Sequence, residues 1–91
     1  MSFRIIYTDA YLKRAAKFIK RHPEILPQYE KTLKLLELNP SHPSLRLHRL
    51  SGPLRDLHSV SINISYRMTL EFFLEDGMIV LVNVGSHDEV Y

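Results

Sequence analysis

The chain has 91 residues and a mass of 10.7 kDa, with 45% hydrophobic and 24% charged residues, which predicts a single folded domain over residues 1–91. It has no Cys, which excludes disulfides, thiolate nucleophiles and cysteine-based metal sites and suits a reducing cytoplasm, and no apolar run long enough to cross a bilayer, so neither membrane anchoring nor secretion is expected. Residues 1–57 hold eleven Lys or Arg against five acids, whereas residues 58–91 hold only Arg67 against five acids. The basic first half indicates either a polyanionic partner or simply a solvated helix face, and the composition leaves both interpretations open.

The first half of the sequence predicts a strand followed by two helices. Residues 3–7 are rich in aromatic and β-branched side chains, which favours a strand. Thr8 or Asp9 can cap a helix over 10–21, where apolar residues recur at helical spacing and basic residues fill the outer face. A second helix is predicted over 27–38, with Pro at its first position and Asn-Pro after its last. Only a few residues join the two helices, so we expect an antiparallel helical hairpin.

From residue 45 onward the hydrophobic period changes from helical to alternating. Strict alternation is typical of strands that are buried on one face, and an Asp-Gly pair between the last two strands is a strong hairpin signal. The predicted strands cover 45–50, 57–64, 66–75 and 78–84. The predicted fold class is therefore α+β: an N-terminal strand, an antiparallel helical hairpin, and a four-stranded, mainly antiparallel sheet packed on the helices.

The alternation also separates an inner face from an outer face of the predicted sheet. The side chains expected to point inward on one strand are His58, Val60, Ile62 and Ile64. Those expected to point outward on this strand and the next are Ser59, Ser61, Asn63, Arg67, Thr69 and Glu71. Arg67 is either paired structurally or held for an anion. His48 on a neighbouring strand and His87 just after the last strand are placed where they can converge with it.

Two imidazoles and one guanidinium suit the cleavage of RNA by its own 2′-hydroxyl group. A base takes the 2′ proton, an acid protonates the departing 5′ oxygen, and a fixed cation stabilises the charge that develops on the phosphate oxygens. Imidazole serves either proton role near neutral pH, and guanidinium grips phosphate in a fork. Which of His48 and His87 is the base stays open. No metal and no cofactor are predicted, because the histidines show no HxH or HxxxH spacing.

The remaining histidines and the aromatic residues have plainer interpretations. His22 precedes a Pro at a helix end and is predicted to be a surface or capping residue. His42 lies in a Pro/Ser loop and His58 falls on the expected core face, so both are predicted to be structural. Tyr66 and Tyr91 can stack on nucleobases, although an aromatic residue in a strand more often packs in a core.

Several strings of the second half together resemble the RelE/ParE toxin superfamily, near its YafQ-like branch. They are Leu47-His48-Arg49-Leu50-Ser51-Gly52, the serine-alternating strand, Tyr66-Arg67-Met68, and Gly85-Ser86-His87-Asp88-Glu89-Val90-Tyr91. The opening strand and helical hairpin match as well, so the resemblance covers nearly the whole chain. No single string is specific, whereas their order and spacing are.

The resemblance implies a toxin of a type II toxin–antitoxin system that cleaves mRNA, usually in the ribosomal A site, and is held inactive by a co-expressed antitoxin. It implies a general base at His48, a phosphate-steadying arginine at Arg67 and a general acid at His87. It also implies an RNA-contacting aromatic residue at Tyr91. The basic residues expected to meet ribosomal RNA are Lys13, Lys17 and Lys20. Operator DNA is expected to be contacted only through the antitoxin.

The sequence departs from the YafQ-like pattern at three positions. That pattern tends to carry His and Asp where this chain has Ser61 and Ser65, and Trp where it has Tyr66. These three positions are still expected to bind substrate, but the missing groups leave open a catalytically weak or silent member that only binds its antitoxin. The superfamily also contains ParE-like inhibitors of DNA gyrase, which is the alternative function. The presence of both His48 and His87 favours RNA cleavage over gyrase inhibition.

Overall fold

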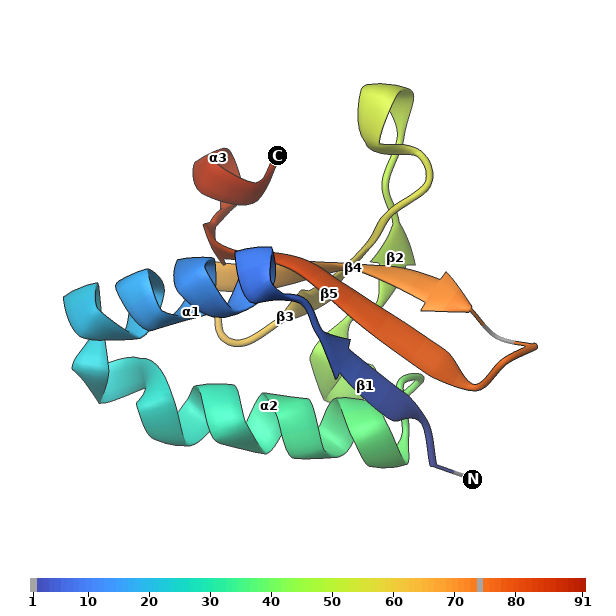
Figure 1. Cartoon of the computed structure of the whole chain (residues 1–91), viewed down its shortest axis with the longest axis horizontal. Coiled ribbons are helices and arrows are strands. Elements are labelled where there is room, and N and C mark those ends of the chain that lie inside the picture. The colour runs from blue at the N-terminus through green and yellow to red at the C-terminus, as the bar shows by residue number, and fades with distance from the viewer. Residues whose placement is uncertain (1, 74) are drawn as a thin grey trace.

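The fold is α+β, as predicted, and is built on one five-stranded sheet. The computed structural model describes residues 2–73 and 75–91. The strands lie side by side in the order β1, β5, β4, β3, β2. The elements are β1 (Arg4–Tyr7), α1 (Asp9–Arg21), α2 (Leu26–Leu38), β2 (His48–Arg49), β3 (His58–Ser61), β4 (Tyr66–Phe73), β5 (Met78–Ser86) and α3 (His87–Val90). Figure 1 shows α2 on one side of the sheet and α3 on the other.

The N-terminal strand joins the sheet as its fifth strand. It runs parallel to β5, with Ile5 opposite Ile79, whereas all other neighbouring strands are antiparallel. The mainly antiparallel arrangement of the last four strands is therefore confirmed. The sheet is nevertheless mixed, because β1 adds one parallel pair beyond β5.

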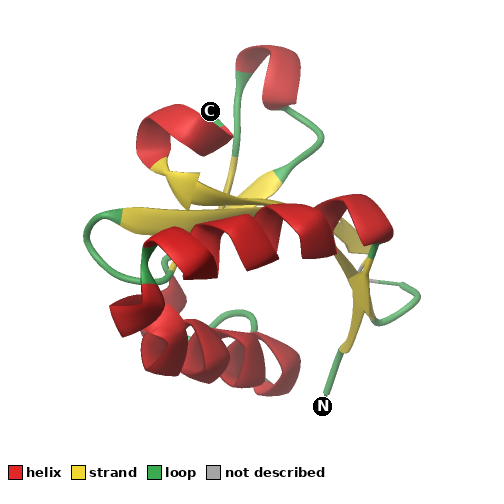
Figure 2. Ribbon diagram, turned by 60° about the vertical axis from the view of Figure 1, so that its left-hand side comes forward, coloured by secondary structure: helices red, strands yellow, loops and turns green. Residues whose placement is uncertain are grey.

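The two long helices form the predicted hairpin within about a residue of the expected bounds. The side chain of Thr8 caps α1 by accepting the amide of Tyr11 at 3.1 Å. A single 3-10 turn over Pro23–Ile25 then leads into α2. The hydroxyls of Tyr11 and Tyr29 hydrogen-bond at 2.7 Å in the core, so a side-chain contact ties the two helices together. Figure 2 shows the two long helices as a hairpin on one side of the sheet.

The core lies between this hairpin and one face of the sheet. Val60, Met68 and Leu70 are fully buried there, as the alternation predicts. Ile64 was expected on the same inner face but is fully exposed, and that prediction is wrong. β3 ends at Ser61, and the Asn63 side chain accepts the amides of the next two residues, which turns the chain before Ile64 can point inward.

The predicted strands 45–50 and 66–75 are longer than the strands observed. Only His48–Arg49 pairs as β2, because Pro43–Leu45 form a 3-10 turn that ends at Arg46 in the left-handed region. β4 ends at Phe73, and Leu74 of the predicted strand lies outside the described residues.

A short C-terminal helix closes over the outer face of the sheet. The Ser86 side chain accepts the amide of Glu89, and the Glu89 carboxylate accepts the amide of Ser86 in return, which forms a capping box at the start of α3. Gly85 allows this approach, because a Cβ there would lie 3.1 Å from the Glu89 side chain. Across the described residues, no helix has the length and apolar character needed to cross a membrane.

Candidate active site

Arg67 lies at the centre of a hydrogen-bonded group on the outer face of the sheet. It stands on β4 opposite Ser61 of β3 and is partly exposed, not turned into the apolar core. Its Nε donates to the Oγ of Ser59 at 2.9 Å. Ser59 is itself fully buried, so the guanidinium is held by a rigid acceptor two residues along the neighbouring strand.

The C-terminal helix brings two more of the predicted residues to this acceptor. The hydroxyl of Tyr91, which follows α3, donates to the same Ser59 oxygen at 2.6 Å. The ring of His87, at the first position of α3, packs edge-on against the Tyr91 ring with their centroids 4.2 Å apart. Ser59 therefore connects β4 with α3, and through Tyr91 it places His87 beside the group.

His48 reaches the group from the other side, on the edge strand β2. It lies opposite Ser59 in the sheet, which puts both side chains on the same face. Its Nδ1 is 3.4 Å from Nη2 of Arg67 and 3.1 Å from the backbone oxygen of Arg46. The structure thus brings His48, Arg67 and Tyr91 together around Ser59, with His87 against Tyr91.

Two open cavities flank this group. One of about 450 Å³ lies between β2, the following turn and the C-terminus, and it is lined by His48, Tyr91 and Leu54 among others. The other, of about 370 Å³, is lined by both Arg46 and Arg67. The second cavity reaches Arg67 itself, whereas the first opens beside His48 and Tyr91.

His87 is exposed to solvent. Its side chain is 70% exposed, and its Nδ1 lies 3.7 Å from the carboxylate of Asp88. Its position depends on the capping box of α3, since it directly follows Ser86. Hydrogen bonds from Ser86, first from its backbone and then from its side chain, hold the pKa of Glu89 below its ordinary value, and Arg21 and His22 act in the same direction.

Of three other sequence-predicted site residues, Tyr66 and Ser65 lie apart from this group, whereas Ser61 lies opposite Arg67. Tyr66 points to the helix side, where its ring packs against Phe18 and its hydroxyl is 3.2 Å from Nδ1 of His22. Ser61 donates to the backbone oxygen of Asn63 but also lines the cavity beside Arg67. Ser65 is exposed in the turn before β4.

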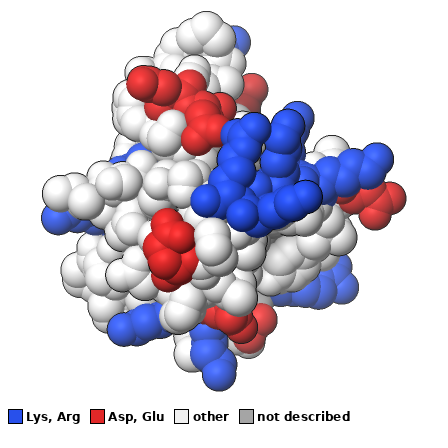
Figure 3. Space-filling view, turned by 90° about the vertical axis from the view of Figure 1, so that its left-hand side faces the viewer, with Lys and Arg blue, Asp and Glu red and all other residues white. Residues whose placement is uncertain are grey.

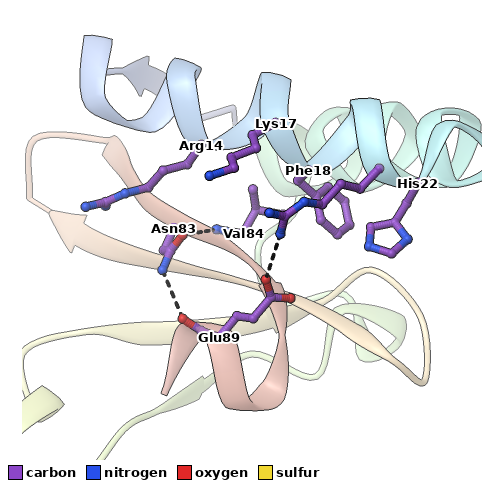
Figure 4. Close-up of a pocket in the computed structure, with 8 residues that line it drawn as sticks. Arg14, Lys17, Phe18, His22, Asn83, Val84 and Glu89 are labelled. Atoms are coloured by element: carbon purple, nitrogen blue, oxygen red, sulfur yellow. Dashed lines mark hydrogen bonds and ion pairs between the residues drawn. The ribbon is translucent and has the colours of Figure 1, made fainter.

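The predicted lysines are all exposed on α1, and one of them lines a groove next to α3. Lys13 and Lys20 point to solvent, whereas Lys17 lines a cavity of about 190 Å³ between α1, β5 and α3. Arg21 lines the same groove and lies 3.9 Å from the Glu89 carboxylate. Figure 4 shows Glu89 reaching from α3 toward α1. Figure 3 shows basic side chains gathered on the face of the molecule that carries the C-terminal end of α1.

The other three histidines have packing or capping contacts. The ring of His22 packs against the rings of Phe18 and Tyr66, which also contact each other. His42 faces Ser44, whose amide donates to its Nδ1 at 3.2 Å. The ring of His58 packs on Phe72, and burial, with help from Arg49 and His48, lowers its pKa.

Sequence reasoning placed Ser59 on the outer face but did not identify it as the residue that holds the site together. The alternating pattern could have identified Ser59 as a partner of Arg67, because it puts both side chains on the same face of the sheet. The role of the Arg46 backbone was not visible, since no local pattern marks a non-glycine residue with positive φ. Among the described residues, no three His, Asp or Glu side chains are grouped to hold a metal ion.

No family model and no curated protein matches the sequence, whereas solved structures match its fold over nearly the whole chain. YafQ from E. coli superposes with a TM-score of 0.80 at 15% identity, covering 98% of each chain. A YoeB/ParE toxin from Agrobacterium tumefaciens gives 0.71 at 9% identity over 93% of this chain and 99% of that one. The toxin–antitoxin complex RelBE2 from Mycobacterium tuberculosis gives 0.66 at 17% identity, covering 96% and 100%. The chain therefore has the fold of the RelE/ParE-like toxins, in the form seen in YafQ.

Proposed function

We propose that this chain is the toxin of a type II toxin–antitoxin system and that it cleaves mRNA by attack of the RNA's own 2′-hydroxyl group. The observation that carries the proposal is the placement of Arg67. Its guanidinium is fixed on Ser59, lies beside His48, and lines one open cavity, while a second cavity opens beside His48 and Tyr91. A fixed cation beside one imidazole, with a second imidazole packed on Tyr91 at the same group, supplies the kinds of side chain that this reaction needs.

Each group has a role that its position supports. One histidine takes the 2′ proton, the 2′ oxygen attacks phosphorus, and the bond from phosphorus to the 5′ oxygen breaks. The other histidine gives a proton to that 5′ oxygen, so a 2′,3′-cyclic phosphate and a 5′-hydroxyl result. Arg67 stabilises the charge on the phosphate oxygens. Tyr91 is the aromatic residue we assign to base contact, because it lines the cavity with His48, whereas Tyr66 packs against the helices.

The proposed partners are a cognate antitoxin and the ribosome with its mRNA. The RelBE2 structure and a DinJ–YafQ structure, which matches this chain with a TM-score of 0.78, are both toxin–antitoxin complexes. A basic groove along α1 supports contact with ribosomal RNA, since phosphate binding is largely charge neutralisation by Lys and Arg. Operator DNA is contacted only through the antitoxin in this proposal, and the chain acts in the cytoplasm.

Induction of the chain in bacteria, with and without the Arg67→Ala substitution, tests the proposal. We expect the unaltered chain to arrest growth and fragment transcripts, and Arg67→Ala to do neither, since removing one stabilising donor from such a site costs roughly 100-fold or more in rate. The control is Arg4→Ala, because Arg4 is an exposed arginine on the edge strand β1, which β5 separates from β4.

Three results would contradict the proposal. Toxicity that persists in a folded Arg67→Ala variant would remove the cleavage mechanism. Growth arrest with intact transcripts would indicate a protein inhibitor, such as one that poisons DNA gyrase. Absence of growth arrest with the unaltered chain would indicate a silent member that binds only its antitoxin.

A further inference from the structure

The backbone at Arg46 is the one departure from ordinary conformation near the site. Arg46 has φ 50° and ψ 46°, and it is the only non-glycine residue with positive φ in the described part of the chain. Side chains other than glycine disfavour this region, so such a residue persists only where its surroundings hold it. Here it ends the 3-10 turn Pro43–Leu45, and its own amide donates to the oxygen of Pro43 at 3.2 Å.

This conformation presents the Arg46 carbonyl to the ring of His48. The backbone oxygen of Arg46 lies 3.1 Å from Nδ1 of His48, two residues further along the chain. A carbonyl can only accept a hydrogen bond. The contact is therefore favourable when Nδ1 carries a proton. It is unfavourable when Nδ1 is unprotonated, because two hydrogen-bond acceptors then face each other.

The second neighbour of the same nitrogen is a hydrogen-bond donor, so its contact is favourable only when Nδ1 carries no proton. Nη2 of Arg67 lies 3.4 Å from Nδ1, and a guanidinium can only donate. Nδ1 cannot satisfy both neighbours at once. The carbonyl contact is the shorter of the two, and Arg67 is already held in place through the bond from its Nε to Ser59 at 2.9 Å. The Arg46 carbonyl therefore determines that Nδ1 of His48 carries the proton.

We propose that the left-handed turn at Arg46 selects the tautomer of His48, with the proton on Nδ1 and the lone pair on Nε2, so that Nε2 is the nitrogen free to accept a proton. The proposal rests on the RNA cleavage proposed above, for which the resemblance implies a general base at His48, and it adds how the reactive nitrogen of that base is chosen. Nε2 takes the 2′ proton while Nδ1–H stays on the Arg46 carbonyl, which stabilises the imidazolium that forms. His87 is then left to protonate the 5′ oxygen. Arg46 acts through its backbone as a positioning residue.

Two substitutions at Arg46 separate its backbone from its side chain. Arg46→Gly and Arg46→Val remove the same guanidinium, but glycine accepts positive φ and valine, which is β-branched, does not. The first readout is the nitrogen chemical shifts of the His48 ring in the isolated protein, which distinguish the two neutral tautomers. We expect the unaltered chain and Arg46→Gly to show the proton on Nδ1, and Arg46→Val to lose that preference.

The second readout is the rate of RNA cleavage. We expect Arg46→Val to fall below Arg46→Gly by about 100-fold, the lower end of what a positioned general base contributes. A proton on Nε2 in the unaltered chain, or equal tautomers and equal rates in the two variants, would overturn the proposal. Because the chemical shifts are measured without RNA, they give a result even if the chain cleaves none. The folded state of each variant is checked by its amide spectrum, and Arg46→Gly alone tests the tautomer if Arg46→Val does not fold.

Discussion

At the scale of single residues, Ser59 organises the outer face of the sheet although it has no reactive chemistry of its own. Its oxygen accepts from both Arg67 and Tyr91, and these two residues come from β4 and from the end of the chain. Both donors converge on one buried atom, so neither side chain needs a second partner to be fixed. Positioning a cation in advance is what makes it effective on developing charge.

Replacing Ser59 with Ala is expected to loosen the site while leaving its charged and imidazole groups in place. The Nε of Arg67 and the hydroxyl of Tyr91 both lose their acceptor, which is expected to cost about 1–3 kcal/mol of stability. We expect RNA cleavage to fall roughly 10- to 100-fold, since small misplacements of reacting groups have effects of that size. Thermal unfolding and a cleavage assay on the purified variant measure the two effects.

The matched control is Ser41→Ala, in the exposed loop after α2. It is expected to change neither quantity. Full activity in a folded Ser59→Ala variant would show that Arg67 does not need this acceptor.

At the scale of elements, the site depends on α3, which has only one turn and is held by its capping box. The Glu89 carboxylate accepts the amide of Ser86 at 2.9 Å and lies 3.9 Å from Arg21 of α1. The positions of His87 and Tyr91 both depend on where this turn of helix lies. A helix this short is marginal without its cap. Protonation of the Glu89 carboxylate should therefore change the positions of His87 and Tyr91.

Acidification is therefore expected to release α3. The folded-state pKa of Glu89 is lowered, so the stability that its carboxylate contributes is complete above its unfolded value of about 4.5 and is lost as pH falls through the folded pKa. We expect the NMR signals of Tyr91 and of the His87 backbone to shift below about pH 4.5. These signals are followed in a pH titration of the purified protein.

Glu89→Gln provides the comparison for this titration. Glutamine can still complete a capping box but does not titrate, so the acid shift at Tyr91 should be absent. A shift of the same size in Glu89→Gln would show that another group controls α3.

At the scale of the whole molecule, periodicity was enough to predict the order of the strands and of the two long helices, and the face of the sheet that carries Arg67, but it did not predict the C-terminal helix α3. Alternation placed Arg67 and Ser59 on one side and Met68 on the other, because side chains in a strand point to opposite faces in turn. It failed at Ile64, where the hydrogen bonds of the Asn63 side chain turn the chain.

Two further features depend on contacts between parts of the chain that are distant in sequence. Tyr91 reaches Ser59 across 32 residues, so only the folded sheet shows that they meet. The parallel pairing of β1 with β5 joins the two ends of the chain in the same way. The conformation of Arg46 is held by its surroundings and opposes its own preference, so no sequence pattern announces it.

The chemistry of the RNA ends tests the account most directly. The purified chain is added to ribosomes that translate a reporter mRNA, and the 3′ ends of the fragments are identified. Attack by the 2′-hydroxyl, with His48 and His87 moving the protons around Arg67, predicts 2′,3′-cyclic phosphate ends that Arg67→Ala does not produce. Fragments that end in a 3′-hydroxyl, or the same ends from Arg67→Ala, would contradict it.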